Sequence, residues 1–353
     1  MSTTPRKRRA RRVYMSIAAQ PDNLGDIAIR QAAIDMLAGA QDRLVVFVGG
    51  MPADYVSAFS FPADSELVRG SGAFMAKYLG DVLRRRAHLI FAPGPLQIRP
   101  GIKPAIKASV NLGNVLLARL SGGQVIALGR ALRGHGWPTH GIERFAIGAY
   151  SLFVARDNVS AKVVGRALDR APDLAFMREI DSTTGGRSRL AISLRGDREV
   201  NAELLQGIVD AARAAGLAPV LVTQVGRDDQ KHRELAGDMN VDIVGWDGTG
   251  HGAQIDRVEE IYRTSRYVVS DRLHALILGM VKGAQPIALV HPGSDKLIST
   301  LDGVVDFTWV GTTATRTPDD LLVAPAEDGL IRSVREARRR LDELAEEVVS
   351  LVG

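Results

Sequence analysis

Arg272 and His274 follow a short run of apolar residues at 267–269 that predicts a buried strand. The apolar stretch after them predicts a helix, with Ser270 or Asp271 as its cap and both side chains on its first turn. Free backbone N–H groups and the helix dipole favour an anion at such a helix start. The pattern therefore predicts a phosphate or carboxylate site, although an isolated S-x-R-x-H also fits a purely structural helix start.

A second candidate site follows the first predicted strand, in the segment PDNLGDIAIRQAA over 21–33. Asn23, Gly25 and Asp26 are expected to form a turn directly before a helix. Gly25 lets the backbone approach a ligand closely, and Asp26 is placed either to cap the helix or to meet a substrate hydroxyl. The turn is therefore a candidate for contacts with a substrate.

Arg195 ends the strand predicted by RLAISLR, and ligands of parallel α/β sheets lie at the carboxyl ends of strands. A salt bridge at a domain edge is the alternative role for Arg195. His251, in a glycine-rich segment, is a weaker candidate for reaching the site. His135 and His140 are spaced too loosely to predict a metal pair, and Trp137 between them is expected either to stack on a sugar or to lie in a surface loop. We expect no metal site.

The length of 353 residues and the apolar content of 46% suit two domains with sizeable cores. The absence of cysteine excludes disulfides, thiolate metal sites and a cysteine nucleophile. No apolar run reaches the roughly 18 residues of a membrane span, and the basic N-terminus lacks the apolar region of a secretory signal. We therefore expect a cytoplasmic protein.

The net charge of +5 is unevenly distributed, because residues 1–12 hold six basic residues and no acidic one. These are Arg6, Lys7, Arg8, Arg9, Arg11 and Arg12. Without them the chain is near neutral, which disfavours a nucleic-acid-binding fold. We expect a disordered basic tail over 1–12 that acts as a solubilising flank or contacts an anionic membrane surface.

Strand-like and helix-like runs alternate along the chain, which predicts an α/β fold with parallel sheets. In the first half we expect strands at 13–18, 44–49, 89–92 and 125–128, and helices near 27–39, 72–86 and 104–121. In the second half we expect strands at 189–195, 219–224, 241–246, 266–270 and 286–290, and helices near 199–215, 228–239 and 256–264.

The linker-like segment DSTTGGRS at 181–188 separates the two series. The expected architecture is two Rossmann-like domains facing a cleft, one over 13–180 and one over 189–325. The last segment, 327–352, predicts a C-terminal amphipathic helix that packs across a domain. Its apolar face comprises Leu330, Val334, Ala337, Leu341, Leu344, Val348 and Leu351.

Five segments, taken in order, resemble the polysaccharide pyruvyl transferase family. They are N-x-G-D at 23–26, R-D-x-x-S at 156–160, P-D-x-x-F at 172–176, I-S-L-R at 192–195, and S-x-R-x-H at 270–274 with Gly283 and Pro286 after it. The resemblance extends from about residue 14 to 292. It implies a GT-B-like fold and a pyruvyl transferase that forms a pyruvate ketal on a cell-envelope saccharide, with phosphoenolpyruvate as donor substrate and no cofactor.

The resemblance also implies roles for individual residues. Arg195 and the S-x-R-x-H segment, with Ser270, Arg272, Leu273 and His274, would hold the donor, and the N-x-G-D turn would lie across the cleft. Two segments depart from the family pattern, namely 93–98 and 129–141. Both lie in the domain over 13–180, which the resemblance implies is the acceptor-side domain, with 189–325 as the donor-binding domain. The saccharide acceptor, which is either soluble or lipid-linked, therefore stays open.

Phosphoenolpyruvate chemistry fits these residue types. Two planar guanidinium groups bind a carboxylate and a phosphate bidentately. Protonation of the methylene carbon makes C2 oxocarbenium-like, a sugar hydroxyl attacks it, and a second hydroxyl expels phosphate. His274 is expected to donate the proton or bind the phosphate, and Asp26 to accept a hydroxyl proton.

Two other functions remain open at this point. A GT-B glycosyltransferase that uses a nucleotide sugar would need a ribose-binding acid late in the chain, such as Asp295 or Asp302. A non-catalytic saccharide-binding relative would explain the altered loops, but the joint presence of Arg195, Arg272 and His274 argues against it.

Overall fold

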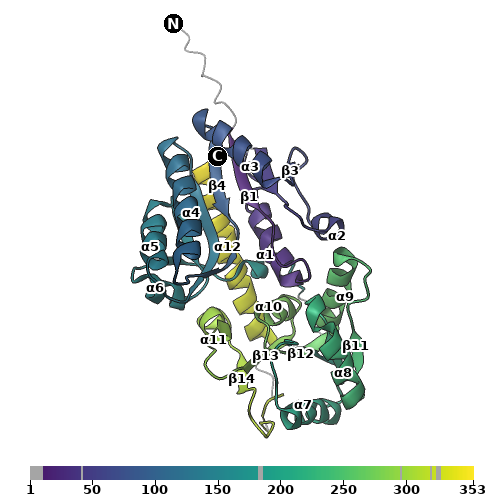
Figure 1. The fold of residues 1–353 in the computed structure, drawn as a ribbon. Helices are drawn as coiled ribbons and strands as arrows, with labels where there is room; N and C mark the ends of the chain where they lie inside the picture. The colour runs from purple at the N-terminus through teal and green to yellow at the C-terminus, as the bar shows by residue number, and fades with distance from the viewer. Residues whose placement is uncertain (1–10, 41–42, 182–185, 295, 319, 323–326) are drawn as a thin grey trace.

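Two parallel sheets, separated by helices, make up the computed structural model (Figure 1). It describes residues 11–40, 43–181, 186–294, 296–318, 320–322 and 327–353. The first sheet has the order β3-β2-β1-β4-β6-β7-β8, with β5 paired to β6, and the second has the order β11-β10-β9-β12-β13-β14. In both, the strand order reverses next to the first strand of the sheet, and ligands of such sheets bind at this switch point.

The elements of the first sheet confirm most of the expected pattern. Its strands are β1 (Arg12–Ser16), β2 (Arg43–Phe47), β3 (Glu66–Val68), β4 (Ala87–Phe91), β5 (Gly94–Gln97), β6 (Val125–Arg133), β7 (Leu152–Ala155) and β8 (Asp169–Arg170). Its helices are α1 (Leu24–Asp35), α2 (Ala53–Ser57), α3 (Ser71–Leu83), α4 (Ile102–Leu120), α5 (Thr139–Ala149), α6 (Asn158–Val164) and the 3-10 turn η1 (Leu174–Met177).

The elements of the second sheet begin at Arg189. Its strands are β9 (Arg189–Ser193), β10 (Ala218–Val222), β11 (Asp242–Val244), β12 (Ser265–Ser270), β13 (Gln285–Val290) and β14 (Thr308–Gly311). Its helices are α7 (Ala202–Ala214), η2 (Gly226–Asp228), α8 (Asp229–Met239), α9 (His251–Thr264), α10 (Leu273–Val281), α11 (Lys296–Leu301) and α12 (Glu327–Val352). The expected linker thus falls between the sheets, and its residues 182–185 lie outside the described ones.

The divergent segments 93–98 and 129–141 contact each other. β6 does not end at residue 128, as expected, but continues to Arg133 because residues 130–133 pair with β5. A Cβ on Gly136 would lie 2.2 Å from the backbone nitrogen of Pro100, so only glycine permits this approach. The two departures from the family pattern therefore form one unit at the carboxyl end of β6.

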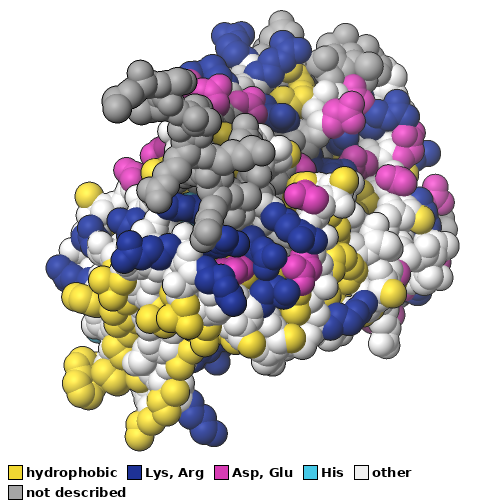
Figure 2. All heavy atoms as spheres, turned by 90° about the horizontal axis from the view of Figure 1, so that it is seen from above, with side chains coloured by type: hydrophobic (Ala, Val, Ile, Leu, Met, Phe, Trp, Pro, Cys, Tyr) yellow, Lys and Arg dark blue, Asp and Glu magenta, His cyan; other side chains and the backbone are white. Residues whose placement is uncertain are grey.

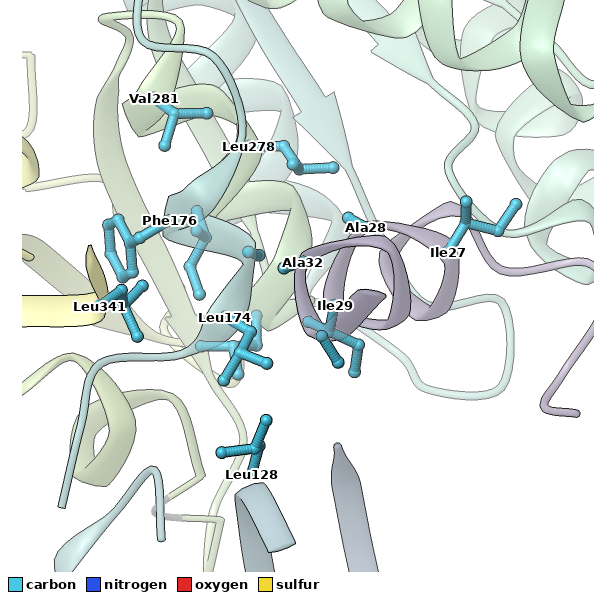
Figure 3. Packing of buried hydrophobic residues seen from close by; sticks show 14 of the residues in the cluster. Ile27, Ala28, Ile29, Ala32, Leu128, Leu174, Phe176, Leu278, Val281 and Leu341 are labelled. Atoms are coloured by element: carbon cyan, nitrogen blue, oxygen red, sulfur yellow. The ribbon is translucent and has the colours of Figure 1, made fainter. Parts of the chain in front are cut away.

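A continuous apolar core joins the two sheets. In Figure 3, residues of α1, η1, α10 and α12 pack together, among them Ala28, Leu174, Leu278 and Leu341. The apolar face of α12 is buried as expected, except that Leu351 is only partly buried and Val352 is buried in addition. Because α12 packs against both η1 and α10, it binds the two halves of the chain to each other.

The first described residues correct the expected limit of the tail. Arg12 is the first residue of β1, and its guanidinium pairs with Asp81 at 3.2 Å. Arg11 donates a hydrogen bond to the carbonyl of Gly122. Both residues belong to the fold because they have fixed partners in it. The other four basic residues of the expected tail, 6–9, lie outside the described residues.

Candidate functional site

A cavity of about 450 Å³ lies at the switch points of both sheets. Its walls come from the loop after β1, from the residue after β7, and from the segments after β9, β12 and β13. Among the described residues, six Lys and Arg side chains line it, against two carboxylates, Asp26 and Asp271. The cations are Arg30, Arg156, Arg195, Arg198, Arg272 and Lys296. This excess of positive charge makes the cavity a site for a polyanion.

Several hydrogen-bond donors around the cavity have no partner among the described residues. The buried atoms without one include Arg30 Nε, Arg156 Nε, Arg272 Nε and Gln224 Nε2. Buried donors are normally satisfied, so four unpaired ones around a single cavity call for a ligand rich in acceptor oxygens. Phosphate and carboxylate groups are the acceptors that guanidinium and imidazole donors bind most strongly.

His274 belongs to a buried group with Asp173 and Arg156. Its Nε2 lies 3.5 Å from Asp173 Oδ2, and Arg156 Nη1 donates to the same oxygen at 2.7 Å. The backbone N–H of Ala175 donates to the other Asp173 oxygen. Burial alone would raise the pKa of Asp173, but His274 and Arg156 outweigh it and hold the pKa below its ordinary value. The carboxylate stays ionised and orients the imidazole.

Gly25 brings α1 into contact with this histidine. A Cβ at position 25 would lie 2.2 Å from His274 Nδ1, so any larger residue would displace the ring. The Asn23 side chain caps α1 by accepting the N–H of Gly25 at 3.0 Å. Asn23 also lines the cavity, whereas Gly25 acts by letting the histidine pack on the helix.

Asp26 lines the cavity from the first turn of α1, and it does not cap that helix. Its Oδ1 accepts a hydrogen bond from Arg30 Nη1 at 3.0 Å, one turn along the helix. The pair places a carboxylate beside a cation at the cavity wall. Both residues come from the first sheet's half, opposite the segment that holds Arg272.

Ser270 and Arg272 depart from their expected positions. Helix α10 begins at Leu273 with Arg272 as its N-cap, so neither Ser270 nor Asp271 is the cap residue. The Ser270 hydroxyl is fully buried, where it accepts the N–H of Arg272 and donates to the carbonyl of Ser193. It fixes the strand end and is not among the residues that line the cavity, whereas Leu273 is.

Arg272 is held by a buried carboxylate. Its Nη2 pairs with Asp228 Oδ2, and Asp228 is only 1% exposed. Burial lowers the pKa of the Arg272 guanidinium, which the Asp228 carboxylate opposes. Asp228 also accepts the N–H of Gly196 at 2.8 Å. The ion pair therefore aligns the arginine with the loop after β9.

Arg195 lines the cavity, and its guanidinium forms two hydrogen bonds with Asp197, at 2.9 and 2.7 Å. Asp197 is mostly exposed, so an incoming anion can replace it at small cost. The backbone N–H of Arg195 donates to Asp271, which also pairs with His291 Nε2. Asp271 thereby connects the ends of β9, β12 and β13 beneath the cavity.

Lys296, at the start of α11, has an unusual environment. Its side chain reaches the cavity, where partial removal from water and the nearby cations Arg156 and Arg195 act together. They lower its pKa to about 8, although the Asp173 carboxylate acts in the opposite direction. A lysine that loses its charge this close to neutral pH responds to small changes in pH or ligand charge.

Sequence analysis did not identify Arg30, Arg156, Asp173 and Lys296 as site residues. Arg156 directly follows β7 and belongs to the R-D-x-x-S segment, and Asp173 follows β8 and belongs to the P-D-x-x-F segment. A signal was therefore present, but these segments served only to support the family resemblance. Arg30 and Lys296 carry no motif signal, and only the folded chain brings them to the cavity.

The weaker histidine candidates lie elsewhere. His251 is not among the cavity residues; it pairs with Asp54 and with the carbonyl of Pro21, which joins α9 to the first half of the chain. The rings of His135 and His140 lie 4.3 Å apart near the exposed Trp137, also away from the cavity. The described residues contain no group of three or more potential metal ligands.

Similar architectures occur among solved structures. The UDP-GlcNAc 2-epimerase of Methanocaldococcus jannaschii has a TM-score of 0.56 and 9% identity, with 96% of this chain and 99% of that chain covered. The UDP-GlcNAc 2-epimerase of Neisseria meningitidis bound to UDP-GlcNAc has a TM-score of 0.52 and 11% identity, with 96% and 94% covered. These similarities and the two parallel sheets confirm the expected GT-B-like fold.

No curated protein sequence shows a significant similarity to the chain. A model of the polysaccharide pyruvyl transferase family matches residues 23–292, a range that starts at Asn23 and includes His274. The match covers most of the chain and confirms the resemblance noted from the five segments. The chain therefore belongs to the polysaccharide pyruvyl transferase family and is a transferase enzyme of that family.

Proposed function

We propose that the enzyme transfers the pyruvyl group of phosphoenolpyruvate to a cell-envelope saccharide as a ketal. The observation that carries the proposal is the cavity, where six described Lys and Arg side chains and four unpaired buried donors lie around His274. Phosphoenolpyruvate presents a phosphate and a carboxylate on one small skeleton, and this charge pattern matches opposed guanidinium groups.

The reaction follows from the same residues. Arg272 and Arg195 bind the two anionic groups, and Arg156 and Lys296 neutralise the rest of the charge. His274, oriented by Asp173, gives a proton to the methylene carbon, and C2 becomes oxocarbenium-like. One saccharide hydroxyl adds to C2, a second displaces phosphate, and the two hydroxyl protons pass to the imidazole and to the leaving phosphate through Asp26.

The direct test combines purified protein, phosphoenolpyruvate and a diol-bearing saccharide from the cell envelope. We expect release of inorganic phosphate together with a saccharide that carries an acid-labile pyruvyl group, detected by mass spectrometry. Consumption of a nucleotide sugar in place of phosphoenolpyruvate would identify a glycosyltransferase. Saccharide binding with no turnover of either donor would identify a non-catalytic relative. Of the two acids considered for ribose binding, Asp302 does not line the cavity and Asp295 lies outside the described residues.

The affinity for phosphoenolpyruvate should fall as the pH rises through about 8. Lys296 has a pKa of about 8, so it is cationic below that pH and neutral above it. The KM for phosphoenolpyruvate should therefore increase at alkaline pH. In a Lys296→Met variant the KM should be higher at neutral pH and should lose this pH step. Lys296→Arg is the control, because its side chain stays charged throughout this pH range. The same rise of KM near pH 8 in Lys296→Met would assign the titration to another group.

Metal chelation should leave the transfer rate unchanged. The cations around the cavity can neutralise the donor without a divalent ion, and protonation of the methylene carbon requires only His274. The measurement compares phosphate release by untreated protein with that by protein treated with EDTA and then freed of the chelator by gel filtration. Loss of activity that one divalent ion restores would contradict this mechanism.

A further inference from the structure

Helix α4 exposes a row of large aliphatic side chains. Ile102 and Leu120, at its two ends, are 78% and 82% exposed. The row, called here the α4 stripe, consists of Ile102, Ile106, Val110, Leu117 and Leu120. Spacings of 4, 4, 7 and 3 residues place all five on one side of the helix. Burial of such side chains is favourable, so a continuous exposed row of this kind marks an interaction surface.

The apolar surface extends beyond α4. Among the described residues, every exposed large hydrophobic side chain except Leu67 and Trp309 lies within 71–168. Besides the α4 stripe, these are Leu79, Leu83, Trp137 and Phe145. A shallow groove between α4 and α5, floored by Pro138 and Ile142, continues the surface. Figure 2 shows hydrophobic side chains gathered on one side of the molecule, with Lys and Arg among and around them.

The exposed charges of this region are all positive. Residues 71–168 contain fourteen basic residues and three acidic ones, and all three acids are buried. Asp81 pairs with Arg12, Asp157 pairs with Arg133, and Glu143 lies below the surface. The exposed cations are Arg84, Arg85, Arg99, Lys103, Lys107, Arg119, Arg144, Lys162 and Arg166. The near-neutral average that we inferred from the sequence for the folded body conceals this segregation.

We infer that this face, made by α3, α4 and α5, docks on the surface of an anionic lipid bilayer. Aliphatic side chains between cations suit such a surface, because the former enter the acyl boundary and the latter contact phosphate headgroups. A second copy of the chain fits poorly, since two faces without exposed carboxylates would repel each other. A nucleic acid would match the charge but would leave the aliphatic α4 stripe exposed to water.

The face lies near the cavity along the chain, which connects docking to the proposed reaction. Pro95 of β5 lines the cavity, and the chain passes from β5 to Ile102 at the start of α4. Docking through α4 therefore brings the cavity close to the bilayer, where a lipid-linked saccharide would present its sugar. No helix within the described residues has the length and hydropathy for crossing a bilayer, and the face requires only surface contact.

Vesicle co-sedimentation tests the inference with the full-length protein. We expect binding to phosphatidylcholine vesicles that contain phosphatidylglycerol, and weak binding to phosphatidylcholine alone. Two variants should each bind these vesicles at least about tenfold more weakly than the wild type. They are Ile102→Ser/Ile106→Ser/Leu120→Ser and Lys103→Gln/Lys107→Gln. The controls are Leu67→Ser/Trp309→Ser, which removes exposed apolar groups elsewhere, and Lys231→Gln/Arg335→Gln, which removes distant exposed cations.

A truncated variant that starts at residue 11 distinguishes binding by the face from binding by the N-terminal tail. If the face docks, this chain should retain binding that depends on the α4 stripe. Binding that disappears with the tail, or that the α4 variants leave unchanged, would overturn the inference. Two other results would also overturn the inference. One is dimerisation, measured by light scattering, that is lost in the α4 variants, and the other is tight RNA binding that the lysine variant abolishes. Activity on a soluble saccharide should be equal in all variants, so failure of docking is distinguishable from failure of the proposed reaction.

Discussion

A Gly25→Ala variant is expected to lose transfer activity by about two orders of magnitude or more, because misplacement of a catalytic group by about 1 Å has effects of this size. The added Cβ would lie 2.2 Å from Nδ1 of His274 and 2.6 Å from its Cβ. The ring must therefore move away from α1, and its Nε2 then leaves Asp173 and the position from which, in the proposed reaction, it protonates the donor.

A glycine at the equivalent helix position provides the control. Gly72 is the second residue of α3, as Gly25 is of α1, and a Cβ there meets nothing within 4 Å. Gly72→Ala should be neutral or slightly stabilising, since alanine favours helix. For Gly25→Ala we expect a circular dichroism spectrum like that of the wild type with a reduced kcat. Full activity in this variant would exclude His274 as the proton donor in its present position.

The Arg272→Ala variant is expected to lose both activity and stability. Asp228 is 1% exposed, and removal of its cation leaves a buried charge uncompensated, which costs about 3–5 kcal/mol. Arg272→Ala/Asp228→Asn removes both charges, and it should recover most of the stability while remaining inactive. Thermal unfolding and phosphate release, measured in parallel, separate the two effects.

Two further substitutions complete this test. Arg272→Lys keeps a charge beside Asp228 but lacks the planar fork, so it should be stable with strongly reduced activity. His274→Ala should be inactive and stable, because Asp173 keeps its partner Arg156 at 2.7 Å. Activity in the Arg272→Ala/Asp228→Asn double variant would show that the arginine serves only to pair with the buried acid.

The part of the site that follows strands could be predicted from the sequence. Arg195 and Arg272 each come two residues after the end of a strand with β-branched or apolar residues, so parallel topology alone brings them to one edge of the second sheet. Asn23 follows β1 of the first sheet. The prediction that Ser270 or Asp271 caps α10 was wrong because both side chains bond to neighbouring strand ends instead. Local preference for a cap gave way to tertiary contacts.

The remaining site residues required the fold itself. Arg30 reaches the cavity from the second turn of α1, and Lys296 reaches it from the short α11, an element with no clear periodicity. Short elements such as β5 and β14 were also missed, because four-residue strands leave little pattern. The long α12, with its regular apolar spacing over 26 residues, was expected at the bounds it adopts.

The helix α12 has a kinetic consequence. Separation of the two sheets by a hinge motion would bring Leu341 and its neighbours on η1 and α10 into water, at a free-energy cost that grows with the exposed apolar area. The backbone bonds between Leu24 and Gln224 and between Gly226 and Asp22 oppose the same motion. Under the proposed reaction, we therefore expect donor entry and phosphate departure to take place through the mouth of the cavity without separation of the two sheets.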